Sequence, residues 1–290
     1  MMAITDYKVP QSMDEAVQML AISGNNIKVL AGGTDLIIQS KPQSQDPLHV
    51  VDIKNLKGMM NATLDSSGLS LGPAISCAEF TSRHDIKAVF PGLVEAAYLI
   101  GSTQVQGRAS IGGNLCNASP AADTIPALVA NNAQCIIQGP DGERTVAAEN
   151  FAVGVGKNCM EPGELLTQIK IATPAPGTSD AYLRFIPRSE MDIAVAGAGV
   201  RITLDSTGRC TDARVAIGAV ATTVLLVPEA AKALIGSMMD DVALQAAADA
   251  ASAASRPISD RRGTAEYRRH VVGVLVKRAA KIAAERVKGE

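Results

Sequence analysis

The segment Lys28-Val29-Leu30-Ala31-Gly32-Gly33-Thr34-Asp35-Leu36 contains the most informative pattern in the sequence. A β-prone run from Ile27 to Ala31 enters a glycine pair, and Thr34 can cap a helix that starts directly after it. Glycine lets backbone amides approach an anion, and a helix N-terminus adds positive partial charge. The segment therefore predicts a strand, a tight turn and a loop that can bind phosphate without a lysine.

A second glycine pair follows in Ser110-Ile111-Gly112-Gly113-Asn114, ahead of a helical pattern from Asp123 to Ala130. Two such turns facing each other would suit a pyrophosphate, although either one alone is more often a plain tight turn. Neither segment contains GxxxxGK or GxGxxG, so the common nucleotide-binding motifs do not apply.

The order of segments along the 290 residues indicates two α+β domains. Strand-like and helical patterns alternate before the Pro-, Gly- and Ser-rich connector 173–179. They begin with a short helix over 13–20 that Ser12 can cap, and they include a hairpin with its turn at 139–142. Three β-type runs follow the connector and suggest an antiparallel meander, and the rest is helical. The expected helices cover 229–235, 242–254 and a long stretch from Thr264.

Composition excludes several classes of protein. Hydrophobic residues make up 47% and charged residues 19%, which is typical of a globular chain, and the net charge of -2 disfavours a nucleic-acid partner. The five cysteines include no CxxC pair, and the three histidines lack metal-ligand spacing, so we expect no metal site and no iron-sulfur cluster in this chain. No apolar run has the length of a membrane span and no signal peptide is evident, so we expect a cytoplasmic protein.

The two glycine segments, extended by the polar stretch 117–123, resemble the paired signature of the FAD-binding subunit of the molybdenum hydroxylases, the family of the carbon monoxide and xanthine dehydrogenases. The likeness extends to 164–166, 182–194 and 257–268. It implies an FAD-binding domain of the PCMH/vanillyl-alcohol-oxidase type over 1–176, with subdomains of about 1–56 and 57–176. A C-terminal α+β domain over 177–290 would contain a three-stranded antiparallel sheet with helices.

The resemblance also implies which residues surround the cofactor. Asp123 would accept hydrogen bonds from ribose hydroxyls, Leu165 and Leu166 would flank the adenine, Arg184 would lie near the flavin pyrimidine and Ile193 against the ring. A solvated strand residue is the alternative reading of Arg184. The full expected set is Lys28, Val29, Leu30, Ala31, Gly32, Gly33, Thr34, Asp35, Leu36, Ser110, Ile111, Gly112, Gly113, Asn114, Ser119, Asp123, Leu165, Leu166, Arg184 and Ile193.

Some positions depart from the family pattern. The segment 104–108 reads Gln-Val-Gln-Gly-Arg where relatives often have Gln-Ile-Arg-Asn, Ser110 replaces a common threonine, and Arg184 replaces a frequent lysine. The hydroxyl at position 110 is kept, whereas arginine and lysine differ in shape and hydration.

The implied function is an FAD-dependent electron-transfer subunit of a multi-subunit molybdenum hydroxylase. It would pass electrons from a partner's iron-sulfur clusters to an external acceptor and would have no catalytic residues of its own. Expected partners are a large subunit with a molybdopterin-type cofactor and a small subunit with two-iron two-sulfur clusters, as a dimer of heterotrimers. A self-sufficient flavin oxidase and a non-catalytic flavin-binding module are the alternatives.

The sequence leaves open the substrate of the complex, the electron acceptor and the role of the basic C-terminal helix. The last 30 residues contain nine Lys and Arg against three Glu, a local charge of +6. A solvated helix face is the simplest reading of this charge, and a subunit interface is the next.

Overall fold

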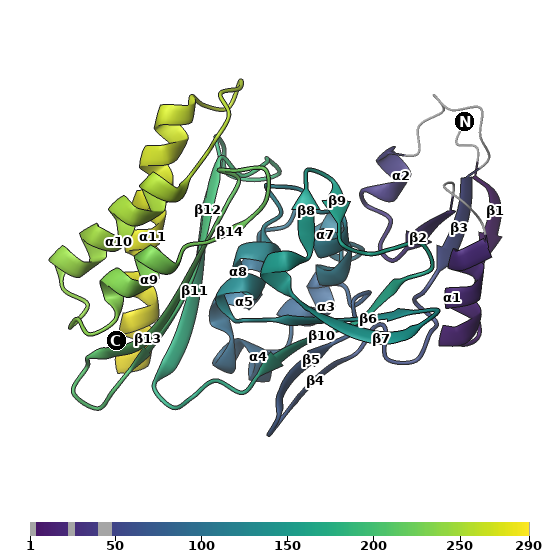
Figure 1. Ribbon diagram of the computed structural model, residues 1–290, viewed down its shortest axis with the longest axis horizontal. Helices are drawn as coiled ribbons and strands as arrows, with labels where there is room; N and C mark the ends of the chain where they lie inside the picture. The colour runs from purple at the N-terminus through teal and green to yellow at the C-terminus, as the bar shows by residue number, and fades with distance from the viewer. Residues whose placement is uncertain (1–3, 23–26, 40–47, 290) are drawn as a thin grey trace.

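The computed structural model describes residues 4–22, 27–39 and 48–289, which form alternating layers of sheet and helix (Figure 1). A small parallel sheet begins the fold at the right of Figure 1, and three helices end it at the left. The α+β class expected from the sequence is confirmed.

The first sheet is parallel, in the order β1-β3-β2. Its strand β2 leads into residues 32–35, which we call the first glycine turn. The helix α1 packs on this sheet, and Ser12 caps it as expected, because its Oγ accepts a hydrogen bond of 3.2 Å from Glu15 N. The short helix α2 follows the glycine turn directly. The bounds are β1 Ile4–Lys8, α1 Met13–Ile22, β2 Ile27–Leu30, α2 Leu36–Gln39 and β3 Leu48–Asp52.

The second sheet is antiparallel, in the order β4-β5-β10-β6-β7, and helices pack on one of its faces. The hairpin expected around Gly139 and Gly142 is confirmed as β6–β7. The strands are β4 Ala62–Asp65, β5 Gly68–Leu71, β6 Gln134–Gly139, β7 Gly142–Ala147 and β10 Leu165–Ala172, with a separate hairpin of β8 Ala152–Gly154 and β9 Lys157–Asn158. The helices are α3 Cys77–Thr81, α4 His84–Val89, α5 Pro91–Tyr98, α6 Thr103–Gln106, α7 Ile111–Cys116, α8 Thr124–Ala130 and the 3-10 turn Ala148–Asn150.

The third sheet is antiparallel, in the order β11-β12-β13-β14, and has helices on both faces. The helices α5 and α8 cover one face, while α11 covers the other, so β12 is buried almost throughout instead of alternating. The fourth strand, β14, adds to the three that the sequence suggests. The bounds are β11 Thr178–Phe185, β12 Ala196–Leu204, β13 Cys210–Gly218, β14 Leu225–Leu226, α9 Pro228–Leu234, α10 Asp241–Ala254 and α11 Ala265–Lys288.

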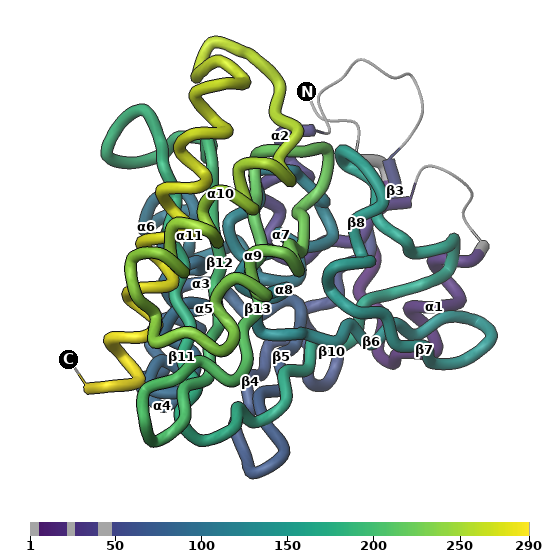
Figure 2. The backbone as a smooth tube through the Cα atoms, turned by 60° about the vertical axis from the view of Figure 1, so that its left-hand side comes forward, coloured from purple at the N-terminus to yellow at the C-terminus, as the bar shows by residue number. Residues whose placement is uncertain are grey.

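The rotated view in Figure 2 shows α9, α10 and α11 in front of the third sheet, with α1 at the opposite side of the molecule. The chain passes from the second sheet to the third between Ala172, the end of β10, and Thr178, the start of β11. A boundary at 176/177 remains a prediction, and this change of sheet is compatible with it.

Candidate cofactor site

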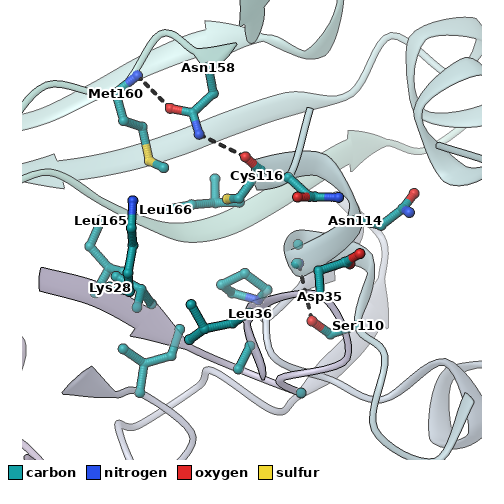
Figure 3. Close-up of a pocket in the computed structure, with 18 of the residues that line it drawn as sticks. Lys28, Asp35, Leu36, Ser110, Asn114, Cys116, Asn158, Met160, Leu165 and Leu166 are labelled. Carbon is teal, nitrogen blue, oxygen red and sulfur yellow. Dashed lines mark hydrogen bonds between the residues drawn. The ribbon is translucent and has the colours of Figure 1, made fainter. Parts of the chain in front are cut away.

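The main cavity has a volume of about 540 Å³ and lies where the first glycine turn, α7 and the start of β10 meet (Figure 3). In Figure 3, Lys28 lies at the end of the cavity next to Leu165, and Asp35 lies at the end next to Ser110. Expected residues that line it are Lys28, Val29, Ala31, Gly32, Gly33, Thr34, Asp35, Leu36, Ser110, Gly112, Gly113, Asn114, Leu165 and Leu166.

The first glycine turn has free hydrogen-bond donors. Gly33 has a φ of +81°, a conformation that glycine adopts without strain. A Cβ on Gly32 would lie 1.7 Å from the carbonyl oxygen of Arg108, so this glycine is what lets the turn contact the chain just before the second motif. Among the described residues, no partner accepts from the backbone N–H groups of residues 32–35. The turn can therefore bind an anion through several backbone amides.

The second glycine pair is used differently, because it lies inside α7 rather than in a turn ahead of a helix. The N–H of Gly112 donates to the carbonyl of Pro73 at 3.0 Å, and the N–H of Gly113 donates to Ser110 Oγ at 3.1 Å. These amides are thus engaged. A Cβ on Gly113 would have only Ser110 Oγ within 4 Å, at 2.8 Å, so the missing side chain opens space in the cavity wall.

The charges in the cavity are unevenly distributed. Among the described lining residues, Lys28 is the one lysine or arginine, whereas three carboxylates, those of Asp35, Glu161 and Glu164, also line the cavity. Glu164 forms a bidentate ion pair with Arg144 at 2.6 Å, and this pair holds the pKa of the Glu164 carboxyl low. Desolvation raises the pKa of the Asp35 carboxyl. The first glycine turn is therefore the part of the cavity best suited to bind an anion.

Six expected residues do not line this cavity. Leu30 and Ile111 belong to the same motifs but are not in the cavity lining, and Ile111 is fully buried. Ser119 accepts a hydrogen bond of 3.3 Å from Ala121 N, and Ile193 is 53% exposed on the connection between β11 and β12. Asp123 and Arg184 pair with each other away from the cavity.

Asp123 uses both carboxylate oxygens inside the protein. One accepts from Tyr182 Oη at 2.9 Å, and the other accepts from Arg184 Nη1 at 2.7 Å. Burial raises the pKa of Asp123 to about 6, against the opposing effect of Arg184. The next residue, Thr124, donates through its hydroxyl to Asn114 Oδ1 at 2.6 Å, so this buried pair is connected to a residue that lines the cavity.

The sequence did not reveal the wall formed by residues 156–164. Gly156, Asn158, Met160 and Pro162 line the cavity there, and Asn158 Nδ2 donates to the carbonyl of Cys116 at 2.8 Å (Figure 3). The turn residues Pro162 and Gly163 before Leu165 are the one sequence signal that could have extended the site in this direction.

Within the described ranges, no cluster of three or more His, Cys, Asp or Glu residues is arranged to hold a metal ion. In the same residues, no helix combines the length and apolar character needed to cross a membrane.

Comparison with known proteins covers nearly the whole chain. Residues 3–174 match the FAD binding domain in molybdopterin dehydrogenase, and residues 181–283 match the CO dehydrogenase flavoprotein C-terminal domain. The carbon monoxide dehydrogenase medium chain of Afipia carboxidovorans is 35% identical over 98% of both chains. The xanthine dehydrogenase FAD-binding subunit of Escherichia coli O157:H7 is 28% identical over 96% of this chain and 95% of its own.

A solved structure is similar over the same length. A chain of the reconstituted CO dehydrogenase from Oligotropha carboxidovorans superposes with a TM-score of 0.92, at 34% identity, covering 97% of this chain and 98% of that one. The matching relatives are subunits of dehydrogenases. The protein thus belongs to the family of FAD-binding medium subunits of the molybdenum hydroxylases, as its two glycine motifs indicate.

Proposed function

We propose that this chain binds one FAD without a covalent bond and transfers electrons within a multi-subunit molybdenum hydroxylase. The observation that carries the proposal is the row of backbone N–H groups at residues 32–35, which have no partner among the described residues and line the same cavity as Gly113. A diphosphate group needs several hydrogen-bond donors and a stretch of backbone that it can approach without meeting side chains. The N–H groups of residues 32–35 and the glycine at position 113 meet these two needs. The residues present therefore fit FAD.

The chain's own residues would bind and orient the cofactor. The amides of residues 32–35 and the polar side chains of Ser110 and Asn114 would hold the pyrophosphate, and Leu165 with Leu166 would flank the adenine. For Ser119, Asp123, Arg184 and Ile193, a role at the ribose or the flavin ring remains a prediction. Bound FAD would accept electrons singly from iron-sulfur centres and deliver them in pairs to an external acceptor.

The proposal includes partner chains. A small subunit with two-iron two-sulfur clusters would supply electrons, and a large subunit with a molybdopterin-type cofactor would oxidise the substrate. A dimer of such heterotrimers in the cytoplasm is the assembly that we propose. The medium chains of two carbon monoxide dehydrogenases and of a glyceraldehyde dehydrogenase, named as such, support a three-chain organisation.

Two experiments test the proposal. Acid precipitation of the purified chain should release all its flavin, and flavin kept on the pellet would contradict non-covalent binding.

Hydroxylation of purines, heterocycles, aldehydes or carbon monoxide should require co-expression with molybdenum and iron-sulfur chains. Turnover by the chain alone would favour a self-sufficient oxidase, whereas FAD binding without any co-purifying partner would favour a non-catalytic module.

A further inference from the structure

An ammonium group holds the first glycine turn from outside the cavity. Lys54 Nζ donates to the carbonyl oxygen of Ala31 at 3.0 Å, and it lies 2.7 and 2.6 Å from the two carboxylate oxygens of Asp52. Ala31 lines the cavity, but Lys54 does not. The three donors of the ammonium are thus divided between one carbonyl and one carboxylate.

The carboxylate that binds this ammonium, that of Asp52, is itself held by several contacts. Asp52 ends β3, its side chain is 9% exposed, and it also accepts hydrogen bonds from Tyr7 Oη and from the backbone N–H of Lys54. The ammonium therefore has a defined place relative to the parallel sheet.

Lys54 continues the pairing of β2 with β3 beyond the end of the sheet. The backbone N–H of Ile53 donates to the carbonyl of Leu30 at 3.2 Å, and the Lys54 side chain donates to the next carbonyl, that of Ala31. Two successive carbonyls of the first motif are thus bound to the segment that follows β3.

The bond at Ala31 fixes the direction of an amide. In a trans peptide the C=O and N–H groups point in opposite directions, and no peptide bond among the described residues is cis. With the Ala31 carbonyl held on Lys54, the N–H of Gly32 points the other way and has no partner among the described residues. A peptide left free to turn could instead direct its carbonyl towards an anion.

We propose that Lys54 is a positioning residue for the pyrophosphate, acting through the Ala31–Gly32 peptide. The inference rests on the proposed function and assigns to this chain a contact outside the glycine motifs themselves. It concerns the diphosphate portion of the ligand, so it applies to ADP as well as to FAD.

The test compares Lys54→Met with Lys57→Met in the full-length chain freed of flavin. Lys57 is exposed and has no hydrogen bond or ion pair among the described residues. Lys54→Met should lower the affinity for FAD and for ADP by the same factor, about tenfold. Adenosine binding should stay unchanged, because adenosine has no phosphate. Lys57→Met should bind all three like the unmodified chain.

A double variant guards against misfolding. Lys54→Met alone leaves the Asp52 carboxylate buried without its cation, so Asp52→Asn combined with Lys54→Met removes both charges. The double variant should show the same selective loss for FAD and ADP. Unchanged ADP affinity, or an equal loss for adenosine, would overturn the positioning role while leaving the proposed function intact. Failure of the unmodified chain to bind either FAD or ADP would overturn both.

Discussion

Asp123 and Arg184 form an ion pair of 2.7 Å in which both side chains are more than nine-tenths buried. Asp123 directly precedes α8 beside the second sheet, and Arg184 lies on β11 of the third, so the pair joins the two family-matched regions of the chain. Tyr182, also on β11, donates to the same carboxylate. Because neither carboxylate oxygen is free, Asp123 in this state holds β11 in place.

Removing one partner of this pair should cost much stability. We expect Arg184→Met to lower the free energy of unfolding at pH 7 by about 3 kcal/mol, because it leaves a buried carboxylate without its cation. Asp123→Asn combined with Arg184→Met should lose clearly less. Denaturant unfolding of both variants would measure the difference.

Arg201→Met is the matched control for this experiment. Arg201 pairs with Asp212 on the same sheet, but the Asp212 side chain is 52% exposed, so we expect a loss within about 1 kcal/mol. If Arg184→Met and Arg201→Met lower the free energy of unfolding equally, the buried pair contributes no more to stability than the exposed one.

The sequence predicted features that depend on the local backbone. The first glycine turn, the cap at Ser12 and the β6–β7 turn were recognisable from their turn and capping residues, whereas the second glycine pair, expected in a turn, lies inside α7. The partner of Asp123 lies 61 positions away, and the ammonium at Ala31 comes from Lys54, in the segment that follows β3. Such pairings depend on how the sheets pack. The two-residue strand β14 was missed because it is too short to show a period.

Gly113 should be essential for the cofactor but not for the fold. A side chain there would enter the cavity and meet only Ser110 Oγ, so we expect Gly113→Val to give a folded, colourless protein. Circular dichroism and the flavin absorbance of the purified variant test this directly. Full FAD occupancy in Gly113→Val would mean that the bound cofactor does not lie against residue 113.

Gly32→Ala should behave differently, because its Cβ would overlap the Arg108 carbonyl at 1.7 Å. The substitution would push apart the two segments that form the cavity, so we expect a loss of both stability and flavin. A stable Gly32→Ala variant would contradict the close contact of these segments.

Flavin-dependent stabilisation should distinguish FAD from FMN. A ligand that binds only the folded state adds about 2.7 kcal/mol at 100 times its dissociation constant. The cavity continues from Ser110 to the Leu165 end, which we assign to the adenylate, and FMN lacks that group. We expect thermal unfolding to shift upwards with FAD and only slightly with FMN. Equal shifts would contradict this assignment.

The buried carboxylate of Asp180 should make stability fall as the pH rises. Asp180 lies on β11 and accepts hydrogen bonds from the N–H groups of Gly92 and Leu93 at the start of α5, at 2.9 and 3.1 Å, and from Asn131 at 2.7 Å. Burial is the largest effect on this carboxyl and raises its pKa to about 6. The neutral acid is therefore favoured in the folded chain.

The sign of the effect follows from this raised pKa. Between about pH 4 and pH 6 the folded chain keeps a proton that the unfolded chain has released, so the contribution of Asp180 is full below about pH 4 and is lost as the pH passes 6. Two pKa units correspond to about 3 kcal/mol. The difference in unfolding free energy between the unmodified chain and Asp180→Asn should shrink by roughly that amount from pH 4 to pH 7. A difference that stays constant with pH for Asp180→Asn would show that this carboxyl does not titrate with folding in the stated range.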